Sequence, residues 1–175
     1  VSISDVTALS GDTAILFSSL QAPITLSNVV ATATAAGNGL SFAAISAAAT
    51  SVSITGGTFK GNHRGIHFPA INAGTVVSIS GAHIEATGTT QEALEFTGNV
   101  AGPLTIRGAW ISQVNAVKSA IWFSAGVVTA AVIIEDTTVV CTSSAIGFSA
   151  SLQAPLTLTN VVSSTTAHNA LYFAA

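Results

Sequence analysis

The amino-acid sequence predicts an all-β fold, a right-handed parallel β-helix of about seven turns with 23–28 residues in each turn. Three observations lead to this prediction. A four-residue pattern that ends in Phe recurs seven times, and a second pattern that ends in Asp, Asn or Gly also recurs seven times. In addition, the stretch FSSLQAPITLSNVV near the start of the chain returns almost unchanged near its end as FSASLQAPLTLTNVV. Self-similarity of this kind, at a period of about 20–50 residues, is typical of solenoids.

The first pattern consists of a small residue, an aliphatic residue, any residue and Phe. Its Phe residues follow one another at intervals of 25–28 residues: Phe17, Phe42, Phe68, Phe96, Phe123, Phe148 and Phe173. The second pattern has two aliphatic residues one position apart and closes on a turn residue: Asp5, Asn28, Gly56, Gly81, Gly108, Asp136 and Asn160. Alternation with a period of two predicts short strands with one buried face. The closing residue types are those that accept left-handed backbone angles at a turn.

Successive turns of such a chain place like residues above like residues, because neighbouring strands lie about 4.8 Å apart. We therefore expect a column of Phe side chains inside the solenoid, and a further inward column formed by Phe59, Ile84, Ile111 and Val139. The uneven length of the turns favours the right-handed type, since left-handed solenoids keep a strict hexapeptide count. A leucine-rich repeat is rejected, because the turn residue follows the last aliphatic residue by two places rather than three and Leu is sparse.

Both patterns resemble those of the right-handed parallel β-helix repeat proteins, and the resemblance extends over the whole chain. This broad group contains pectate-lyase-like enzymes, autotransporter passengers, surface adhesins and phage tailspikes. The resemblance implies the fold, and we expect a protein of the adhesin or autotransporter-passenger kind. It implies no particular activity, because one fold carries many functions.

The repeat runs from end to end, so residues 1–175 are predicted to form a single β-solenoid domain. A longer period is visible within it. Residues 1–44 align with residues 132–175 after about two single-residue gaps, and the segment SLQAP occupies the same place in both copies. The sequence therefore predicts a super-repeat of about 131 residues.

The composition excludes several classes of partner. Charged residues make up 6% of the chain, whereas soluble domains average about 25%. A net charge of −3 without a basic cluster argues against nucleic acid and anionic membranes. Ser, Thr and Gly interrupt every apolar run before it reaches the length of a membrane span, so no membrane insertion is expected. Cys141 is the only cysteine, which excludes an intrachain disulfide and predicts a buried, unreactive thiol.

The few charged residues fall into columns when they are counted back from each Phe. Arg64 shares a column with Glu92, and His67 shares one with Glu95. Arg107 and Glu135 form a third pair, in the column of the second pattern. Because neighbours in a column lie about 5 Å apart, we expect solvated ion pairs between turns, each worth about 0–1 kcal/mol.

No catalytic, cofactor-binding or metal-binding site is predicted. A glycosidase needs two carboxylates about 5–9 Å apart, and the only candidates, Glu92 and Glu95, are expected to be neutralised by basic neighbours. A calcium site needs several clustered carboxylates, and Glu135–Asp136 is the only adjacent acidic pair. An enzyme that acts on polysaccharides, which some members of the similar group are, is kept as the second alternative.

Two sets of outward residues are candidate surface contacts. Trp122 and Tyr172 occupy the outward position of the Phe-ending pattern, where a ring can stack on a carbohydrate. We favour a lateral contact between solenoids, or a partly covered ring, for both. The outward residues of the second pattern are mostly hydroxylated, among them Thr25, Ser27, Thr157 and Thr159. This ladder resembles the ice-binding faces of some antifreeze β-solenoids, although we favour the simpler reading, that Ser and Thr are ordinary residues of an exposed strand without charge.

Taken together, these features favour a non-catalytic structural or adhesive solenoid outside the cell or on its surface, with ice binding as the first alternative. The scarcity of charge and the uniform surface of small residues support this expectation, and few Lys and Arg residues leave few sites for trypsin-like proteases.

Both ends of the chain are predicted to be uncapped, because Val1 begins directly on a strand pattern and Phe173 is followed by only two residues. Terminal turns of a solenoid expose strand edges and open core. We expect Val1, Ile3 and Phe173 to stack on more of the same fold, either identical subunits head to tail or neighbouring repeats of a longer chain. Contacts of this kind do not close and build filaments.

Overall fold

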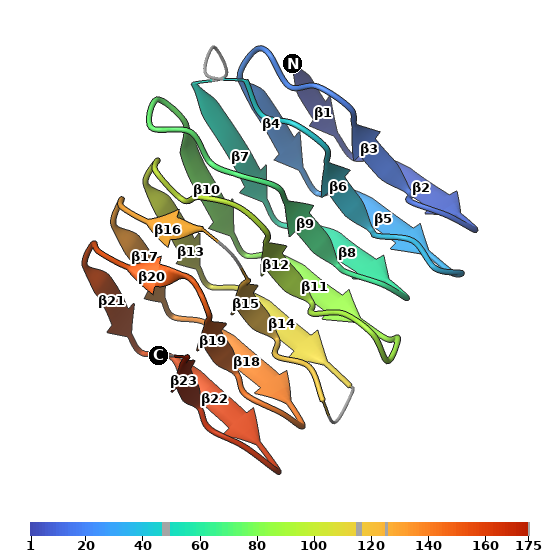
Figure 1. Ribbon diagram of the computed structural model, residues 1–175. Coiled ribbons are helices and arrows are strands. Elements are labelled where there is room, and N and C mark those ends of the chain that lie inside the picture. Colours follow the sequence, from blue (N-terminus) through green and yellow to red (C-terminus); the bar gives the residue numbers. More distant parts are fainter. Residues whose placement is uncertain (47–49, 115–116, 125, 175) are drawn as a thin grey trace.

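The computed structural model describes residues 1–46, 50–114, 117–124 and 126–174, and shows a chain that winds as a stack of parallel strands (Figure 1). The regular elements in these residues are all β-strands, and three seven-stranded parallel sheets run along the stack. The prediction of an all-β parallel solenoid of about seven turns is confirmed. Among the described residues, no helix is long and apolar enough to cross a membrane.

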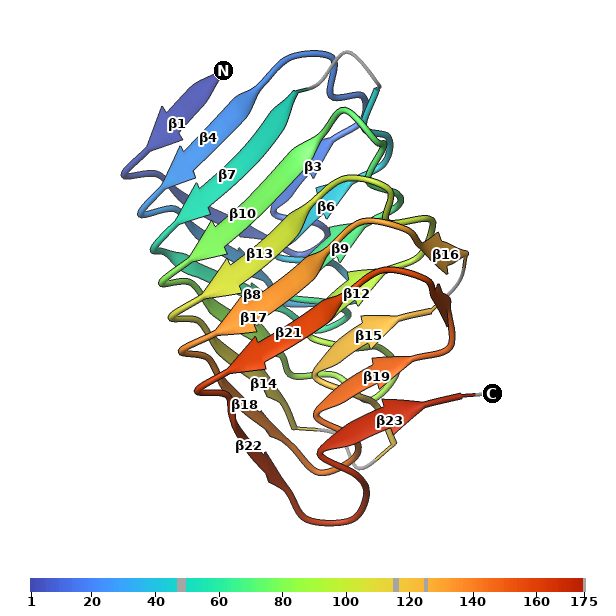
Figure 2. The same cartoon turned by 90° about the vertical axis from the view of Figure 1, so that its left-hand side faces the viewer.

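Each turn contributes one strand to each of the three sheets (Figure 2). Sheet A contains β1 (Ser2–Ser4), β4 (Ile24–Ser27), β7 (Ser51–Thr55), β10 (Val76–Ser80), β13 (Leu104–Arg107), β17 (Val132–Glu135) and β21 (Leu156–Thr159). Sheet B contains β2 (Thr7–Ser10), β5 (Val30–Ala33), β8 (Thr58–Gly61), β11 (His83–Ala86), β14 (Trp110–Gln113), β18 (Thr138–Cys141) and β22 (Val162–Thr165). Sheet C contains β3 (Ile15–Phe17), β6 (Leu40–Phe42), β9 (Ile66–Phe68), β12 (Leu94–Phe96), β15 (Ile121–Phe123), β19 (Ile146–Phe148) and β23 (Leu171–Phe173). A small fourth sheet pairs β16 (Val127–Val128) with β20 (Ser151–Leu152).

The interior is filled by the predicted columns. Neighbouring Phe rings of sheet C stack from Phe17 to Phe173, with centroids 4.4–5.3 Å apart and planes within 16° of parallel. Phe59 lies in register with Ile84, which continues to Ile111 and Val139 in sheet B. Phe59, Ile84, Ile111 and Val139 are fully buried. The regular strand spacing brings them into contact, so burial of apolar surface and ring stacking act in the same direction.

Sheet A passes to sheet B through a two-residue turn in every winding of the chain. The first residue of each turn has a positive φ between 50° and 64°, and these residues are the ones that close the second sequence pattern: Asp5, Asn28, Gly56, Gly81, Gly108, Asp136 and Asn160. The side-chain amide of Asn28 donates a hydrogen bond to the Asp5 carboxylate (3.3 Å), and that of Asn160 donates to Asp136 (3.1 Å). The same bond thus occurs in both copies of the super-repeat, which itself stays a prediction.

Sheet B passes to sheet C through longer and less regular connections. Residues 62–65 follow β8, residues 87–93 follow β11 and residues 142–145 follow β18. These connections stack beside the outer face of sheet C, where they add side chains that the short turns between sheets A and B do not supply. This difference decides where the candidate site lies.

The terminal turns lie at opposite ends of the stack (Figure 2). Val1 exposes 71% and Phe173 exposes 51% of its surface, whereas the Phe side chains of the five turns in between are buried. Ile3 is partly buried against the core. The part expected of Val1, Ile3 and Phe173 in assembly stays a prediction.

Candidate functional site

The outer face of sheet C carries the most varied side chains of the solenoid. Each of its strands has three residues, of which the first and third point inward and the middle one points outward. From the first turn to the last, the outward residues are Leu16, Ser41, His67, Glu95, Trp122, Gly147 and Tyr172. Two groups of residues build on this row, a polar network in the middle turns and an aromatic pair in the later ones.

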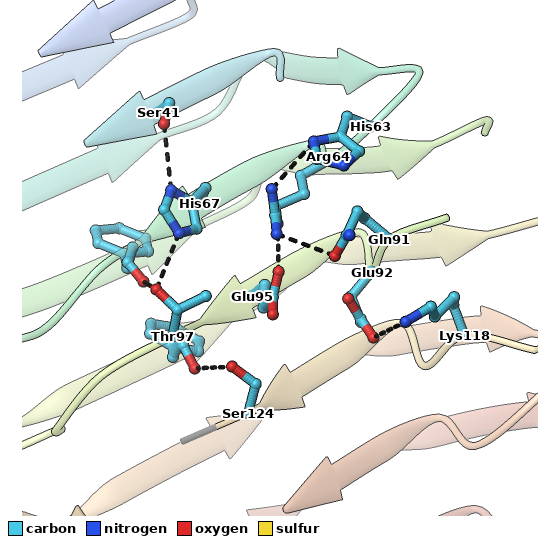
Figure 3. A network of polar contacts seen from close by, with 12 residues as sticks. Ser41, His63, Arg64, His67, Gln91, Glu92, Glu95, Thr97, Lys118 and Ser124 are labelled. Carbon is cyan, nitrogen blue, oxygen red and sulfur yellow. Dashed lines mark hydrogen bonds and ion pairs between the residues drawn. The ribbon is translucent and has the colours of Figure 1, made fainter. Parts of the chain in front are cut away.

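The polar network consists of nine side chains from the strands of sheet C and the segments next to them (Figure 3): Ser41, His63, Arg64, His67, Gln91, Glu92, Glu95, Thr97 and Lys118. Glu92 and Glu95 each expose only 5% of their surface. The expectation of solvated ion pairs is therefore wrong for these two carboxylates. The stacked connections from sheet B cover them, and the Phe spacing alone could not predict how those connections fold.

Arg64 forms an ion pair with Glu95, and not with Glu92 as its column predicted. A second guanidinium nitrogen donates a hydrogen bond to the Gln91 side-chain oxygen (2.9 Å), and a third donates to Nδ1 of His63 (3.1 Å). The guanidinium group reaches the carboxylate on the strand because its long side chain extends along the outer face from the connection. The repeat spacing predicted which backbone positions lie side by side, but it did not predict that Arg64 would pair with Glu95.

His67 is a neutral hydrogen-bonding residue and does not form the expected ion pair with Glu95, although the two are partners in register. Its Nδ1 lies 3.2 Å from the Ser41 hydroxyl and its Nε2 lies 3.0 Å from the Thr97 hydroxyl. Burial, with the Arg64 charge acting in the same direction, lowers the pKa of His67 to about 4. Burial and Arg64 also lower the pKa of His63.

Glu92 differs from Glu95 in how well it is paired. One of its oxygens lies 3.5 Å from the Lys118 ammonium, while the other is buried without a hydrogen-bond partner among the described residues. Burial raises the pKa of Glu92, and the nearby Glu95 charge raises it further, against the opposing effect of Lys118. Neither carboxylate lines the surface hollows described below, and both tie one turn of the solenoid to another.

The aromatic pair lies next to this network on the same face: Trp122 is the register partner of Glu95, and Tyr172 lies two turns beyond Trp122. The rings of Trp122 and Tyr172 stack nearly parallel, with centroids 6.2 Å apart and planes 15° from parallel. Gly147 occupies the strand position between them, and a Cβ atom there would lie 2.1 Å from the Trp122 ring. The rings border a hollow of about 320 Å³ whose other walls include Ser119, Ser144 and Asn169. The outward placement of both aromatic residues was predicted, but their contact across Gly147 was not.

Sheet B carries a second aromatic feature. His83 and Trp110 are partners in register, and their rings meet edge to face with centroids 4.2 Å apart. Beside Trp110, a hollow is lined by Val114, Val140 and Cys141 among others. The Cys141 thiol is buried and hydrogen-bonded to the Ser143 carbonyl oxygen (3.3 Å), and burial raises its pKa. A buried thiol with a raised pKa is unreactive, as expected.

Sheet A presents the predicted ladder of hydroxyl groups. Thr25 lies in register with Ser2 and Ser53, and Ser27 lies in register with Ser4 and Thr55. Towards the other end, Thr157 and Thr159 are the partners of Ile133 and Glu135. Arg107 interrupts the ladder and lies 3.6 Å from Glu135, its predicted partner, and 3.5 Å from Asp136. This side of the solenoid is flat and regular, in contrast to sheet C.

Metal ligation was also considered. Among the described residues, no group of three or more His, Cys, Asp or Glu side chains could hold a metal ion.

Comparisons of the chain with protein-family models, with curated proteins and with solved structures each find no match. The function of the chain is therefore inferred from the geometry of the sheets and of their outer faces.

Proposed function

We propose that this chain is a non-catalytic structural solenoid, a rigid segment of an assembly outside the cell or on its surface. One observation carries the proposal: seven turns keep the same register in three sheets, and the Phe column runs through all of them without a break. Such a stack resists bending because backbone hydrogen bonds in three sheets hold each turn to the next. A rod or spacer needs this property and needs little else.

The charged residues support the same role. The Arg64–Glu95, Lys118–Glu92 and Lys60–Glu85 pairs each join residues of different turns. These pairs reinforce the axis of the stack rather than leave charges free for a reaction. Arg64 is also largely covered, which removes one of the four Lys and Arg residues from the reach of proteases.

The partner that best fits this role is more of the same fold. Phe173, Leu171 and Leu158 present an apolar layer at one end of the stack, and Val1 and Ile3 lie at the other. Another turn of the same kind, from a second copy or from neighbouring repeats, would continue the strands and cover this layer.

Light scattering and electron microscopy of the 175-residue chain test the assembly. We expect concentration-dependent end-to-end particles, and we expect Phe173→Asp to abolish them by placing a charge in the contact. Leu16→Asp is the matched control, because Leu16 is as exposed as Phe173 but lies on the outer face of sheet C. A monodisperse monomer at high concentration would contradict end-to-end assembly.

A catalytic role for the buried carboxylates is tested separately with polysaccharide substrates. The structural proposal expects no lyase or hydrolase activity in the parent chain. An activity that disappears in Glu92→Gln, with the fold intact by circular dichroism, would replace the structural role with an enzymatic one.

Ice binding is a second candidate, favoured by the in-register hydroxyl ladder of sheet A. Regular spacing of hydroxyl groups on a flat sheet is the feature that would order water. If this candidate holds, the parent shows thermal hysteresis and the double variant Thr25→Tyr/Thr157→Tyr loses it, whereas Leu16→Asp on sheet C keeps it. The absence of hysteresis in the parent ends this candidate.

A further inference from the structure

We propose that the hollow beside Trp122 and Tyr172 binds one pyranose ring of an uncharged glycan. The site lies on the outer face of sheet C, over β15, β19 and β23, which are neighbours at the later end of the stack (Figure 2). This inference goes beyond the structural role and does not depend on it, because a rod needs no such hollow.

The two rings act as one platform and not as a clamp. A ligand ring held between two parallel aromatic planes needs about 7 Å between them, twice the optimal carbon–carbon contact distance. The Trp122 and Tyr172 centroids are 6.2 Å apart with nearly parallel planes, so the rings already contact each other. They therefore offer a continuous apolar surface that a ligand can cover from the side of the hollow.

Gly147 makes the platform possible. It occupies the outward position of the turn between the two rings, and any side chain there would collide with Trp122, since a Cβ atom would lie 2.1 Å from the ring. The indole can thus lie across the backbone of β19 and reach towards Tyr172. The platform is held in place before a ligand arrives, which reduces the loss of side-chain entropy on binding.

The walls of the hollow select the chemical class of the ligand. Ser119, Ser143, Ser144 and Asn169 supply hydroxyl and amide groups, His168 adds an imidazole, and none of the described residues that line the hollow is Lys, Arg, Asp or Glu. An apolar floor with neutral polar walls matches a sugar ring, which has a face of C–H groups and a rim of hydroxyl groups. The volume of about 320 Å³ is at the lower end of the range for ligand sites, which fits one ring and not a branched cluster.

A second solenoid packed against this face is the rival occupant. A flat neighbouring sheet could cover the rings, but it could not enter the hollow, and the exposed Asn169 amide at its edge would lose contact with water without gaining a partner. Buried polar groups without partners destabilise a contact by about 1–3 kcal/mol each. The concave shape therefore favours a small hydroxylated ring.

The chain contains its own reference surface for this site. In the alignment of residues 1–44 with residues 132–175, Leu16 matches Gly147 and Ser41 matches Tyr172. The first copy thus keeps the strand and the Phe column but lacks both the small residue under the indole and the second ring. Tyr172→Ser converts the platform residue to its counterpart and leaves the fold pattern unchanged.

Titration with neutral hexasaccharides tests the site. The probes are cellohexaose, xylohexaose and mannohexaose, with hexagalacturonate as the anionic comparison, and binding is followed by tryptophan fluorescence and calorimetry. We expect saturable binding of at least one neutral probe. Trp122→Ala lowers that affinity by at least about tenfold, and Tyr172→Ser lowers it by about two- to tenfold. Trp110→Ala on sheet B is the matched control and leaves affinity unchanged.

Three outcomes overturn the proposal: no saturable binding of any neutral probe, binding that persists unchanged in both Trp122→Ala and Tyr172→Ser, or binding of hexagalacturonate alone. Tyr172 lies in the exposed last turn, so its variant keeps the test valid if Trp122→Ala fails to fold. Light scattering without sugar identifies the rival: a particle size that falls in Trp122→Ala shows that the face is a contact between copies. End-to-end assembly blocked by Phe173→Asp is a separate result and decides only the structural role.

Discussion

The solenoid contains two Arg–Glu pairs of the same chemistry in different surroundings. Arg64 and Glu95, at the outer face of sheet C, expose 14% and 6% of their side chains, whereas Arg107 and Glu135 on sheet A expose 61% and 29%. Both pairs join neighbouring turns, and both acids lie on regular strands with the same spacing. The strand geometry therefore cannot explain why one pair is buried and the other is not.

The difference comes from the connections at the edges of the sheets. Sheet A ends in two-residue turns, which add the Asp136 carboxylate beside Arg107 and Glu135 but leave the pair open to solvent. Sheet C is preceded by longer connections, which supply Arg64, Gln91, Glu92 and Lys118 and cover the carboxylates. In this solenoid the strands fix the scaffold, and the length of a connection decides whether the neighbouring face is bland or chemically distinct.

The largest expected effect comes from removing the acid of each pair. Glu95→Gln leaves the guanidinium of Arg64 buried without a counter-charge, so we expect the free energy of unfolding to fall by about 2–4 kcal/mol. Glu135→Gln removes an exposed pair, and Asp136 remains beside Arg107, so the loss should stay below about 1 kcal/mol. Urea denaturation of both variants measures the contrast. Equal losses would show that the connections do not desolvate sheet C.

Acidification gives the next largest effect, through His67. Its pKa is near 4 in the folded chain and about 6.5 in the unfolded chain, so between these values the unfolded chain binds the extra proton. Stability is full above about pH 6.5 and falls as the pH drops towards 4. We expect a loss of about 1–2 kcal/mol, less than the whole shift implies because the ring keeps some contact with solvent.

The His67→Gln variant isolates this contribution, because Gln can bond to Ser41 and Thr97 without titrating. His63, whose pKa is lowered as well, adds a smaller term of the same sign, and Glu92 adds one of the opposite sign. The stability of the variant should therefore depend less on pH between 4 and 6.5. A pH profile identical to that of the parent would mean that the pKa of His67 is not lowered in the folded chain.

Glu92→Gln is expected to change stability by less than about 1 kcal/mol at pH 7, despite being as buried as Glu95. The pKa of Glu92 is raised, so the stability that its protonated form contributes is lost as the pH rises and the carboxyl group ionises. The ionised form is poorly solvated in this buried position. Replacing it by a neutral amide offsets the lost contact with Lys118. A loss as large as that of Glu95→Gln would show that Lys118 pairs with Glu92 more strongly than the 3.5 Å separation indicates.

The smallest effect is expected on the hydroxyl ladder. Ser78→Ala and Ser80→Ala, both partly exposed on β10, should each change the free energy of unfolding by no more than about 0.5 kcal/mol. Differential scanning calorimetry resolves a shift of this size only as a small change in Tm. A larger loss would indicate that the sheet A hydroxyls are bonded to one another in a way that exposed Ser residues are not.

The parts of the structure that the sequence predicted share one property: they follow from period-two alternation and from the repeat. The Phe column, the inward position of Phe59 and the positive φ of the closing residues are of this kind, since each depends only on strand spacing or on what Gly, Asn and Asp tolerate. The register of Arg107 with Glu135 follows in the same way.

The parts that could not be predicted depend on side chains outside the strands. Arg64 and Glu92 lie in connections whose lengths vary from turn to turn, so a count from the nearest Phe does not give their direction. The contact of Trp122 with Tyr172 depends on the absence of a side chain at Gly147, one turn away from either ring. Such contacts join three turns at once, whereas the repeat describes only one turn and its neighbour.

The uniform register also bears on how fast such a chain can fold. Each strand pairs with strands one turn away, so that Ile3 faces Leu26 and Ile24 faces Val52, a separation of 23–28 residues at either step. Further turns would add contacts of the same separation and no longer ones, so the relative contact order falls as turns are added. Folding can begin at any turn and spread by docking of the next. A solenoid of this design can grow by duplication of its turns without slowing the search for its native state.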